Sequence, residues 1–203
     1  MTTPTPRIPP LPPREWPEEM RPAMAALVPE EPRHPLPVQG GDRPKGLNAL
    51  GTLARHPRLT RAFNTFNGHI LFGTTLSLRH RELIVLRVAS LRACDYEWKQ
   101  HVVQGVDVGL SLEEIERVTA GPAASGWSPL EQQILQAVDE LVADALVTDE
   151  TWAGLAHTLD TEQLMDLVFT VGCYDLIAML FNSAGVQPDD DLVSFLEAKG
   201  VAR

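Results

Sequence analysis

Helix-start signals recur along this chain, and they limit its fold more than any other feature. Ser77, Ser111, Ser128, Thr148 and Thr161 each precede a segment whose apolar residues return every three or four positions. A Ser or Thr side chain at such a position accepts a hydrogen bond from a backbone N–H of the first helical turn. No segment shows the sustained two-residue alternation and hairpin turns of a sheet. The sequence therefore predicts an all-α fold.

Apolar periods and prolines give the approximate extent of each helix. Ser111 with Glu114, and Ser128 with Glu131, have the spacing of a capping box. We expect helices over residues 47–66 with a break near His56-Pro57, then over 78–91, 94–105, 112–118, 129–146, 149–159 and 161–184, and a short helix in the tail. The segment 161–184 is apolar on nearly all sides, so we expect it to be buried.

The first part of the chain is rich in proline. Residues 1–44 contain 13 of the 17 prolines, which exclude regular helix over most of this stretch. We therefore divide the chain into an extended arm, 1–44, and a single helical domain, 45–203. Apolar residues at helical spacing predict a short helix over 17–27 within the arm. These apolar side chains favour an arm that lies on the domain or on a neighbouring subunit over a disordered leader.

Composition limits the partners of the chain. Its 203 residues, 44% of them hydrophobic, can bury a core of their own. The net charge of −10 argues against nucleic acid or a membrane, so we expect a small-molecule substrate. No apolar run reaches the length of about 18 residues that spans a bilayer, which favours a cytoplasmic location. Cys94 and Cys173 are too few for a disulfide framework, and we expect free thiols.

Ionisable residues gather in one stretch, ELIVLRVASLRACDYEWKQH, from Glu82 to His101. In a helix that begins near Cys94, the side chains of Cys94, Glu97 and His101 share one face. Glu82 approaches the same place if the preceding helix packs antiparallel to this one. Such a cluster is costly to bury without a reason. A plainer interpretation also stands: Glu97 and His101 form a common surface pair, and Cys94 is a small buried apolar residue.

The same residues resemble a known family. The spacing of Glu82, Cys94, position 97 and His101 is similar to that of the carboxymuconolactone decarboxylase family, which includes the alkyl hydroperoxidase AhpD-like proteins. The segments RHRELIVLRVA and VGCYDLIAMLFNSAG resemble those of longer, decarboxylase-like members. The resemblance covers about residues 45–187 and implies an AhpD-like helical bundle. It also implies a homo-oligomer, because members assemble as dimers, trimers or hexamers.

One departure from the family pattern bears on the chemistry. In AhpD-like peroxidases a second cysteine stands at position 97, and the two thiols cycle through a disulfide. Glu97 replaces it here, so a local dithiol mechanism is impossible unless Cys173 or a partner's thiol resolves an oxidised Cys94. A glutamate followed four residues later by histidine instead resembles true carboxymuconolactone decarboxylases.

The leading hypothesis is acid–base chemistry without a cofactor or a metal: decarboxylation, lactone isomerisation or a similar proton transfer on a small oxygenated or carboxylated substrate. His101 is the expected general acid or base, Glu97 orients it and Glu82 completes the relay. A protonated His101 would stabilise a developing enolate. The residues that we expect to line the substrate site are His69, Phe72, Trp98 and Tyr174.

Two alternatives stay open. The first is reduction of peroxides by Cys94 as a single thiol, because a helix N-terminus and a nearby His101 should favour the thiolate. The second is a non-catalytic helical scaffold or partner-binding protein, for which we expect Glu97 and His101 to be exposed and to point apart. A metal bound by the four ionisable residues is the least favoured interpretation, because the pattern is nonspecific.

Overall fold

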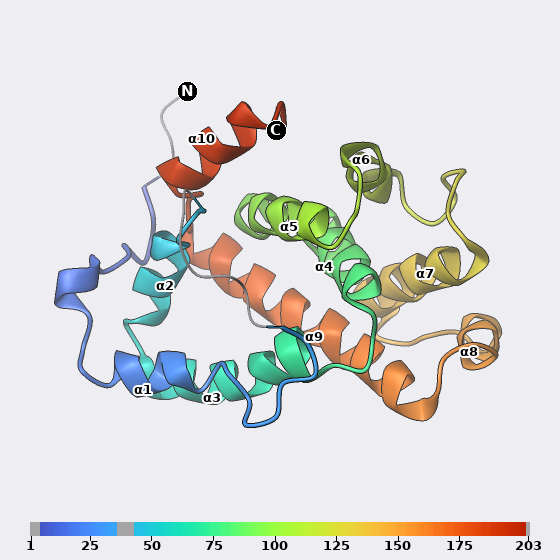
Figure 1. Ribbon diagram of the computed structural model, residues 1–203, viewed down its shortest axis with the longest axis horizontal. Helices are drawn as coiled ribbons and strands as arrows, with labels where there is room; N and C mark the ends of the chain where they lie inside the picture. Colours follow the sequence, from blue (N-terminus) through green and yellow to red (C-terminus); the bar gives the residue numbers. More distant parts are fainter. Residues whose placement is uncertain (1–4, 36–42, 202–203) are drawn as a thin grey trace. The chain divides into compact units, whose positions relative to one another are not determined.

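The computed structural model describes residues 5–35 and 43–201, and the regular structure in these ranges is helical. No strand occurs within these ranges, as the sequence predicted. Two of the helices are short and irregular: η1, Pro13–Glu15, is a 3-10 helix, and η2, His69–Gly73, is a π-helix. The α-helices are α1 Met20–Ala25, α2 Leu47–Leu53, α3 Pro57–Gly68, α4 Leu78–Leu91, α5 Asp95–Asp107, α6 Leu112–Ala120, α7 Pro129–Asp144, α8 Asp149–Ala156, α9 Thr161–Ala184 and α10 Asp190–Ala198 (Figure 1).

The predicted caps Ser77, Ser111, Ser128 and Thr148 are confirmed. Thr161 is instead the first residue of α9, and the cap is Asp160, whose carboxylate accepts from the backbone N–H of Gln163. The hydroxyl of Ser77 accepts a hydrogen bond from the backbone N–H of His80 at the start of α4. Helices α6 and α7 begin with complete capping boxes, because the carboxylates of Glu114 and Glu131 accept from the backbone N–H of the capping serines. These contacts satisfy backbone donors that a helix leaves unpaired at its first turn.

The described residues form two compact units. One is Thr75–Ala178, and the other combines Met1–Thr74 with Met179–Arg203, so that α9 runs from the first of these units into the second. We refer to Thr75–Ala178 as the central unit and to the other as the terminal unit. The predicted boundary between residues 44 and 45 stays a prediction.

The arm packs within the terminal unit. Met20 and Ala23 of α1 are buried together with Ala54, and Leu11, Trp16, Met24 and Leu53 pack around them. The backbone N–H of Arg7 donates to the carbonyl of Ala184, 2.7 Å away. The predicted short helix is therefore present, although it covers Met20–Ala25 rather than 17–27. The backbone N–H of Met20 donates to the carbonyl of Pro17, and the residues between them form a turn before the helix begins.

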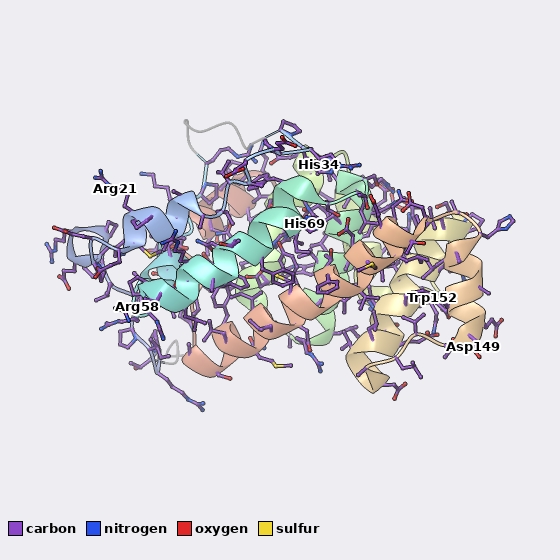
Figure 2. All side chains as sticks on the ribbon, turned by 90° about the horizontal axis from the view of Figure 1, so that it is seen from below. Arg21, His34, Arg58, His69, Asp149 and Trp152 are labelled. Carbon is purple, nitrogen blue, oxygen red and sulfur yellow. The ribbon has the colours of Figure 1, made fainter. Side chains whose placement is uncertain are left out.

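Two glycines, one at the end of α3 and one at the end of η2, stand where other atoms come close. A Cβ atom on Gly68 would lie 2.3 Å from the carbonyl oxygen of Leu27 in the arm. A Cβ atom on Gly73 would lie 2.9 Å from Nδ1 of His69, whose side chain is exposed on the terminal unit (Figure 2). The sequence did not predict that the segment between them would be the π-helix η2.

Helix α4 is the buried axis of the central unit. Its residues 81–89 are all buried, and it packs against α5, α6 and α7. Leu83, Ile84, Leu86 and Val88 are fully buried. Since apolar neighbours surround α4 on every side, any charged group on it must find its partner within the protein.

Helix α9 differs from the prediction in two ways. It was expected to be buried, but one face is exposed along its length, with Met165, Phe169, Leu176 and Met179 each more than half exposed. We also expected no segment able to span a bilayer, whereas α9 is long and apolar enough by length and composition, with 56% of the relevant window buried inside the protein. The buried core helix of a globular protein can have the same length and composition, so this finding alone does not indicate a membrane span. The cytoplasmic location stays a prediction.

Candidate active site

Helix α4 carries Arg81 and Glu82 into the interior of the central unit. The side chain of Glu82 has no exposed surface, and that of Arg81 is 7% exposed. Nε and Nη2 of Arg81 donate to Oε1 of Glu82 over 2.8 and 2.5 Å. A charged hydrogen bond of this kind holds a buried carboxylate in its ionised form.

Helix α5 brings the imidazole of His101 to the other oxygen of Glu82. The chain turns between α4 and α5 at Ala93, whose φ of 48° is left-handed, and α5 then packs against α4 (Figure 1). Nδ1 of His101 lies 2.7 Å from Oε2 of Glu82. Nε2 lies 3.3 Å from Oε2 of Glu97, one turn earlier on α5. His101 is therefore held between two carboxylates, as the spacing of the three residues predicted.

These contacts raise the pKa of His101. Burial alone would lower the pKa of this imidazole, but the charges and hydrogen bonds of Glu82 and Glu97 outweigh burial and raise it to about 9. Burial would in turn raise the pKa of Glu82, yet His101 and Arg81 hold that pKa below its ordinary value. At neutral pH the pair is thus an imidazolium beside a carboxylate.

The four groups form a row of alternating charge, which we call the charged row: Arg81, Glu82, His101 and Glu97. With His101 protonated the row has no net charge, whereas a neutral imidazole would leave one uncompensated negative charge in the interior. The side chains at the two ends of the row are similarly exposed, Arg81 by 7% and Glu97 by 9%, and Glu82 and His101 between them are more deeply buried.

Tyr174 of α9 packs on the imidazole. The two rings meet edge to face, with centroids 4.9 Å apart and an interplanar angle of 89°. Burial raises the pKa of Tyr174 well above its ordinary value, and the carboxylates of Glu97 and Glu82 raise it further. The phenol therefore keeps its proton, and it stands beside the imidazole. Its role in binding a substrate stays a prediction.

Cys94 does not have the environment that we expected. It occupies the N-cap of α5 and is 1% exposed. Burial raises the pKa of its thiol to about 12; the carboxylate of Glu97 adds to this effect, while backbone N–H groups of Glu97 and Tyr96 oppose it. The prediction that the helix N-terminus favours the thiolate is wrong, because loss of hydration outweighs the helix N–H groups.

Cys173 is the second buried thiol of the central unit, and burial together with Glu97 raises its pKa to about 12. Both cysteines are free, as predicted.

The remaining candidate residues are placed as follows. Trp98 follows Glu97 on α5 and is buried in the central unit. His69 and Phe72 belong to η2 in the terminal unit, so their role in binding a substrate stays a prediction. Within the described ranges, no group of three or more His, Cys, Asp and Glu side chains could hold a metal ion.

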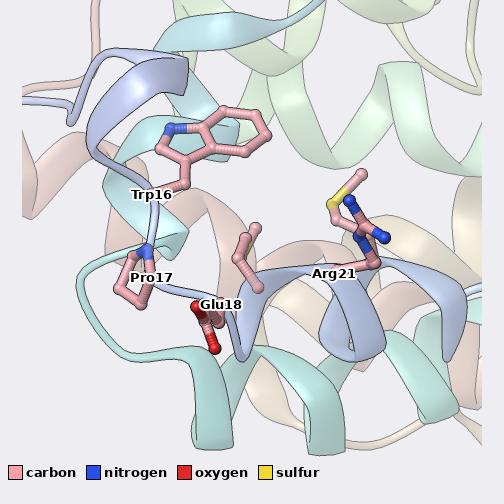
Figure 3. Close-up of a pocket in the computed structure, with 6 residues that line it drawn as sticks. Trp16, Pro17, Glu18 and Arg21 are labelled. Atoms are coloured by element: carbon pink, nitrogen blue, oxygen red, sulfur yellow. The ribbon is translucent and has the colours of Figure 1, made fainter.

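A cavity of about 650 Å³ lies in the terminal unit, away from the charged row in the sequence. Figure 3 shows its lining, which comes from α1 and the segment that precedes it: Trp16, Pro17, Glu18, Met20, Arg21 and Met24. It contains none of the residues that the sequence analysis singled out for chemistry.

Comparison with known families gives a match that includes the charged row. Residues 57–140 match the carboxymuconolactone decarboxylase family. Over this stretch, which is less than half of the chain, the protein is similar to that family. The match contains Glu82, Cys94, Glu97 and His101, and it confirms the family that the sequence resembles. Comparison with curated proteins gives no match.

Solved structures share the fold. The debrominase Bmp8, as a cysteine-to-alanine variant in complex with 2,3,4-tribromopyrrole, has a TM-score of 0.70 at 13% identity, over 94% of this chain and 96% of that one. The alkylhydroperoxidase AhpD core of a peroxidase-related protein from Ralstonia eutropha JMP134 has a TM-score of 0.66 at 21% identity, over 73% of this chain and 79% of that one. A protein of unknown function from Agrobacterium tumefaciens has a TM-score of 0.64 at 18% identity, over 68% and 94%. The predicted AhpD-like helical fold is confirmed.

The sequence analysis missed Arg81, although this residue contacts Glu82 directly. The signal was available in the sequence, because an arginine next to a glutamate inside an apolar helix needs an internal partner. Adjacent residues in a helix point in different directions, so two neighbouring side chains are seldom partners. The long guanidinium of Arg81 nevertheless reaches back to Oε1 of Glu82.

Proposed function

We propose that this protein is an enzyme that uses His101 as a general acid on a small oxygenated or carboxylated substrate, in a decarboxylation, a lactone isomerisation or a related proton transfer. The observation that carries the proposal is the position of the imidazole between the carboxylates of Glu82 and Glu97. A pKa of about 9 means that His101 holds its proton at neutral pH and can donate it.

The geometry assigns different tasks to the two nitrogens of His101. Nδ1 is bound to Glu82, which Arg81 keeps ionised, so this contact fixes the ring. Nε2 has the longer contact, to the slightly exposed Glu97, and is the nitrogen that can turn to a substrate oxygen. In a decarboxylation the carbon–carboxylate bond breaks, its electron pair moves onto an enolate oxygen, and Nε2–H stabilises and protonates that oxygen as carbon dioxide leaves.

The arrangement does not have the features that we associated with a scaffold. Glu97 and His101 are buried and in contact, rather than exposed and apart. Retaining four ionised groups in a buried row costs stability, which favours a chemical role over a structural one.

The test compares two histidine substitutions. Substrates are screened among small lactones and β-keto acids by release of carbon dioxide and by proton uptake. His101→Gln should lower turnover of an accepted substrate by about 100-fold or more, because it removes the proton donor but keeps a polar side chain. His157→Gln, at the exposed C-cap of α8, is the matched control and should leave turnover unchanged. Wild-type turnover in His101→Gln would refute the proposal.

Single-thiol peroxide reduction remains the second candidate, supported by the name of one protein with this fold, the alkylhydroperoxidase AhpD core. In that reaction the sulfur of Cys94 takes one oxygen from ROOH, which leaves as ROH, and becomes a sulfenic acid. With its pKa near 12, Cys94 should react slowly at neutral pH. Rapid formation of sulfenic acid in the wild type, absent in Cys94→Ser, would favour this candidate over the first.

A further inference from the structure

The exposed face of α9 is a narrow apolar stripe. Met165, Phe169, Gly172, Leu176 and Met179 follow one another at intervals of four, three, four and three residues. At 100° per residue these positions lie within an arc of about 80°. The four large side chains are between 52% and 55% exposed. An even stripe of this kind on a helix that is otherwise buried is the pattern of a helix that meets another helix.

Gly172, at the middle of this α9 stripe, has no explanation within the chain. A glycine inside a helix costs stability relative to alanine, and it is retained where a backbone must come close. A Cβ atom on Gly172 would meet nothing within 4 Å, whereas one on Gly68 or Gly51 would collide with the arm. The chain itself therefore does not require a small residue at this position. Close approach of a second helix would require one.

The residues of the α9 stripe are arranged nearly symmetrically along the sequence about Gly172. Met165 and Met179 stand seven residues on either side of it, and Phe169 and Leu176 stand three and four residues away. In an antiparallel pair of identical helices that cross at Gly172, each methionine faces a methionine and each Phe169 faces a Leu176. A patch that is complementary to itself is what a twofold contact between identical chains requires.

Charge and area also fit a second copy. The charged residues of α9 beyond its first turn are Asp166, which is buried and accepts from Thr75, and Asp175, which is paired with Arg92. The stripe thus presents no charge to a copy that also has a net charge of −10. The exposed parts of its side chains amount to about 400 Å² a chain and about 800 Å² a pair, below the size of a permanent interface, which indicates reversible association.

We propose that the α9 stripe is a dimerisation surface, on which a second copy of this chain lies antiparallel with its own stripe, the two helices crossing at Gly172. The arrangement gives the expected homo-oligomer a definite contact. It does not depend on the function proposed for His101.

The first experiment measures mass in solution against concentration, by sedimentation of the full chain. The wild type should pass from monomer to dimer within the range of about 1 to 200 µM. Leu176→Glu should shift the midpoint upward by at least tenfold, because each dimer would bury two like charges. Leu146→Glu is the matched control: this leucine is 65% exposed but lies between α7 and α8, and its substitution should leave the midpoint unchanged.

Cysteine pairs then test the direction of the helices. Met165 and Met179 are 14 residues apart, so Met165 lies about 21 Å from its own counterpart in an antiparallel pair but next to the partner's Met179. Mixed with the Met179→Cys variant, Met165→Cys should form an intermolecular disulfide under a mild oxidant such as diamide, and Met165→Cys alone should not. The native thiols are buried and give the wild-type background.

Four results would overturn the proposal. The first is a monomeric wild type throughout the concentration range, and the second is association that Leu176→Glu and Leu146→Glu alter equally. The third is binding of the wild type to phosphatidylcholine vesicles, lost in Leu176→Glu without any dimer in solution, which would mean that the stripe meets lipid instead. Cross-linking of Met165→Cys with itself would exclude the antiparallel arrangement.

Discussion

Arg81 shows how one side chain sets the charge of the whole site. It is the cation at one end of the charged row, and both of its contacts with Glu82 reach the oxygen that His101 does not use. Glu82 is therefore bound on one side by a permanent cation and on the other by a titrating one. A carboxylate in this position stays ionised when His101 releases its proton, and so the relay can return to its starting state.

Arg81→Met should destabilise the protein by about 3 to 5 kcal/mol, since it leaves a buried carboxylate without its permanent counter-ion. The free energy of unfolding in urea measures the loss. Arg14→Met is the control, because Arg14 forms an exposed pair with Glu15 and should change stability by less than about 1 kcal/mol. Equal effects of the two substitutions would mean that the Arg81 contact contributes little.

Glu97 links the acid and the two thiols. Its carboxylate raises the pKa of Cys94 and of Cys173, after burial, and it also raises the pKa of His101. Glu97→Gln should therefore lower all three values while leaving both thiols above their ordinary pKa. Alkylation rates against pH follow the thiols, and imidazole chemical shifts follow His101. If only the thiols responded, the contact between Glu97 and His101 would be absent in solution.

At the scale of the element, the helix caps are what the sequence predicts best. A cap depends on residues within one turn, so Ser128 and Glu131 determine the start of α7 wherever that helix packs. Ser128→Ala should lower the free energy of unfolding by about 1 kcal/mol, because it leaves a backbone N–H of α7 without its partner. Ser125→Ala, in the exposed loop just before it, is the matched control and should be neutral.

Features that depend on packing were harder to predict. The contact between Glu82 and His101 followed from spacing once α4 and α5 were assumed to pack together. The thiol of Cys94 was misjudged because its place at a helix N-terminus is visible in the sequence, whereas its burial is not. For the same reason hydropathy could not show which face of α9 is exposed, since Met165 and Leu176 are as apolar as the residues that it buries.

For the whole molecule, the buried pair of Glu82 and His101 couples folding to pH. The pKa of His101 is about 9 in the folded protein and near 6.5 in an unfolded chain. Between these values the folded state binds a proton that the unfolded state has released, so stability must fall as pH rises. The contribution is complete below about pH 6.5 and is lost as pH passes through 9. Glu82, whose pKa is lowered, acts in the opposite sense and only in acid.

The free energy of unfolding should therefore fall by about 1 to 2 kcal/mol between pH 6.5 and pH 8 in the wild type. This range avoids His80, whose pKa burial lowers, and it stays below the pH at which unfolded thiols ionise. Glu82→Gln removes the main charge that raises the pKa of His101. It should lower stability throughout and flatten the slope over this range. His157→Gln should keep the wild-type slope, because that imidazole is exposed at the end of α8. A slope that persisted in Glu82→Gln would show that another group, and not the charged row, makes folding sensitive to pH.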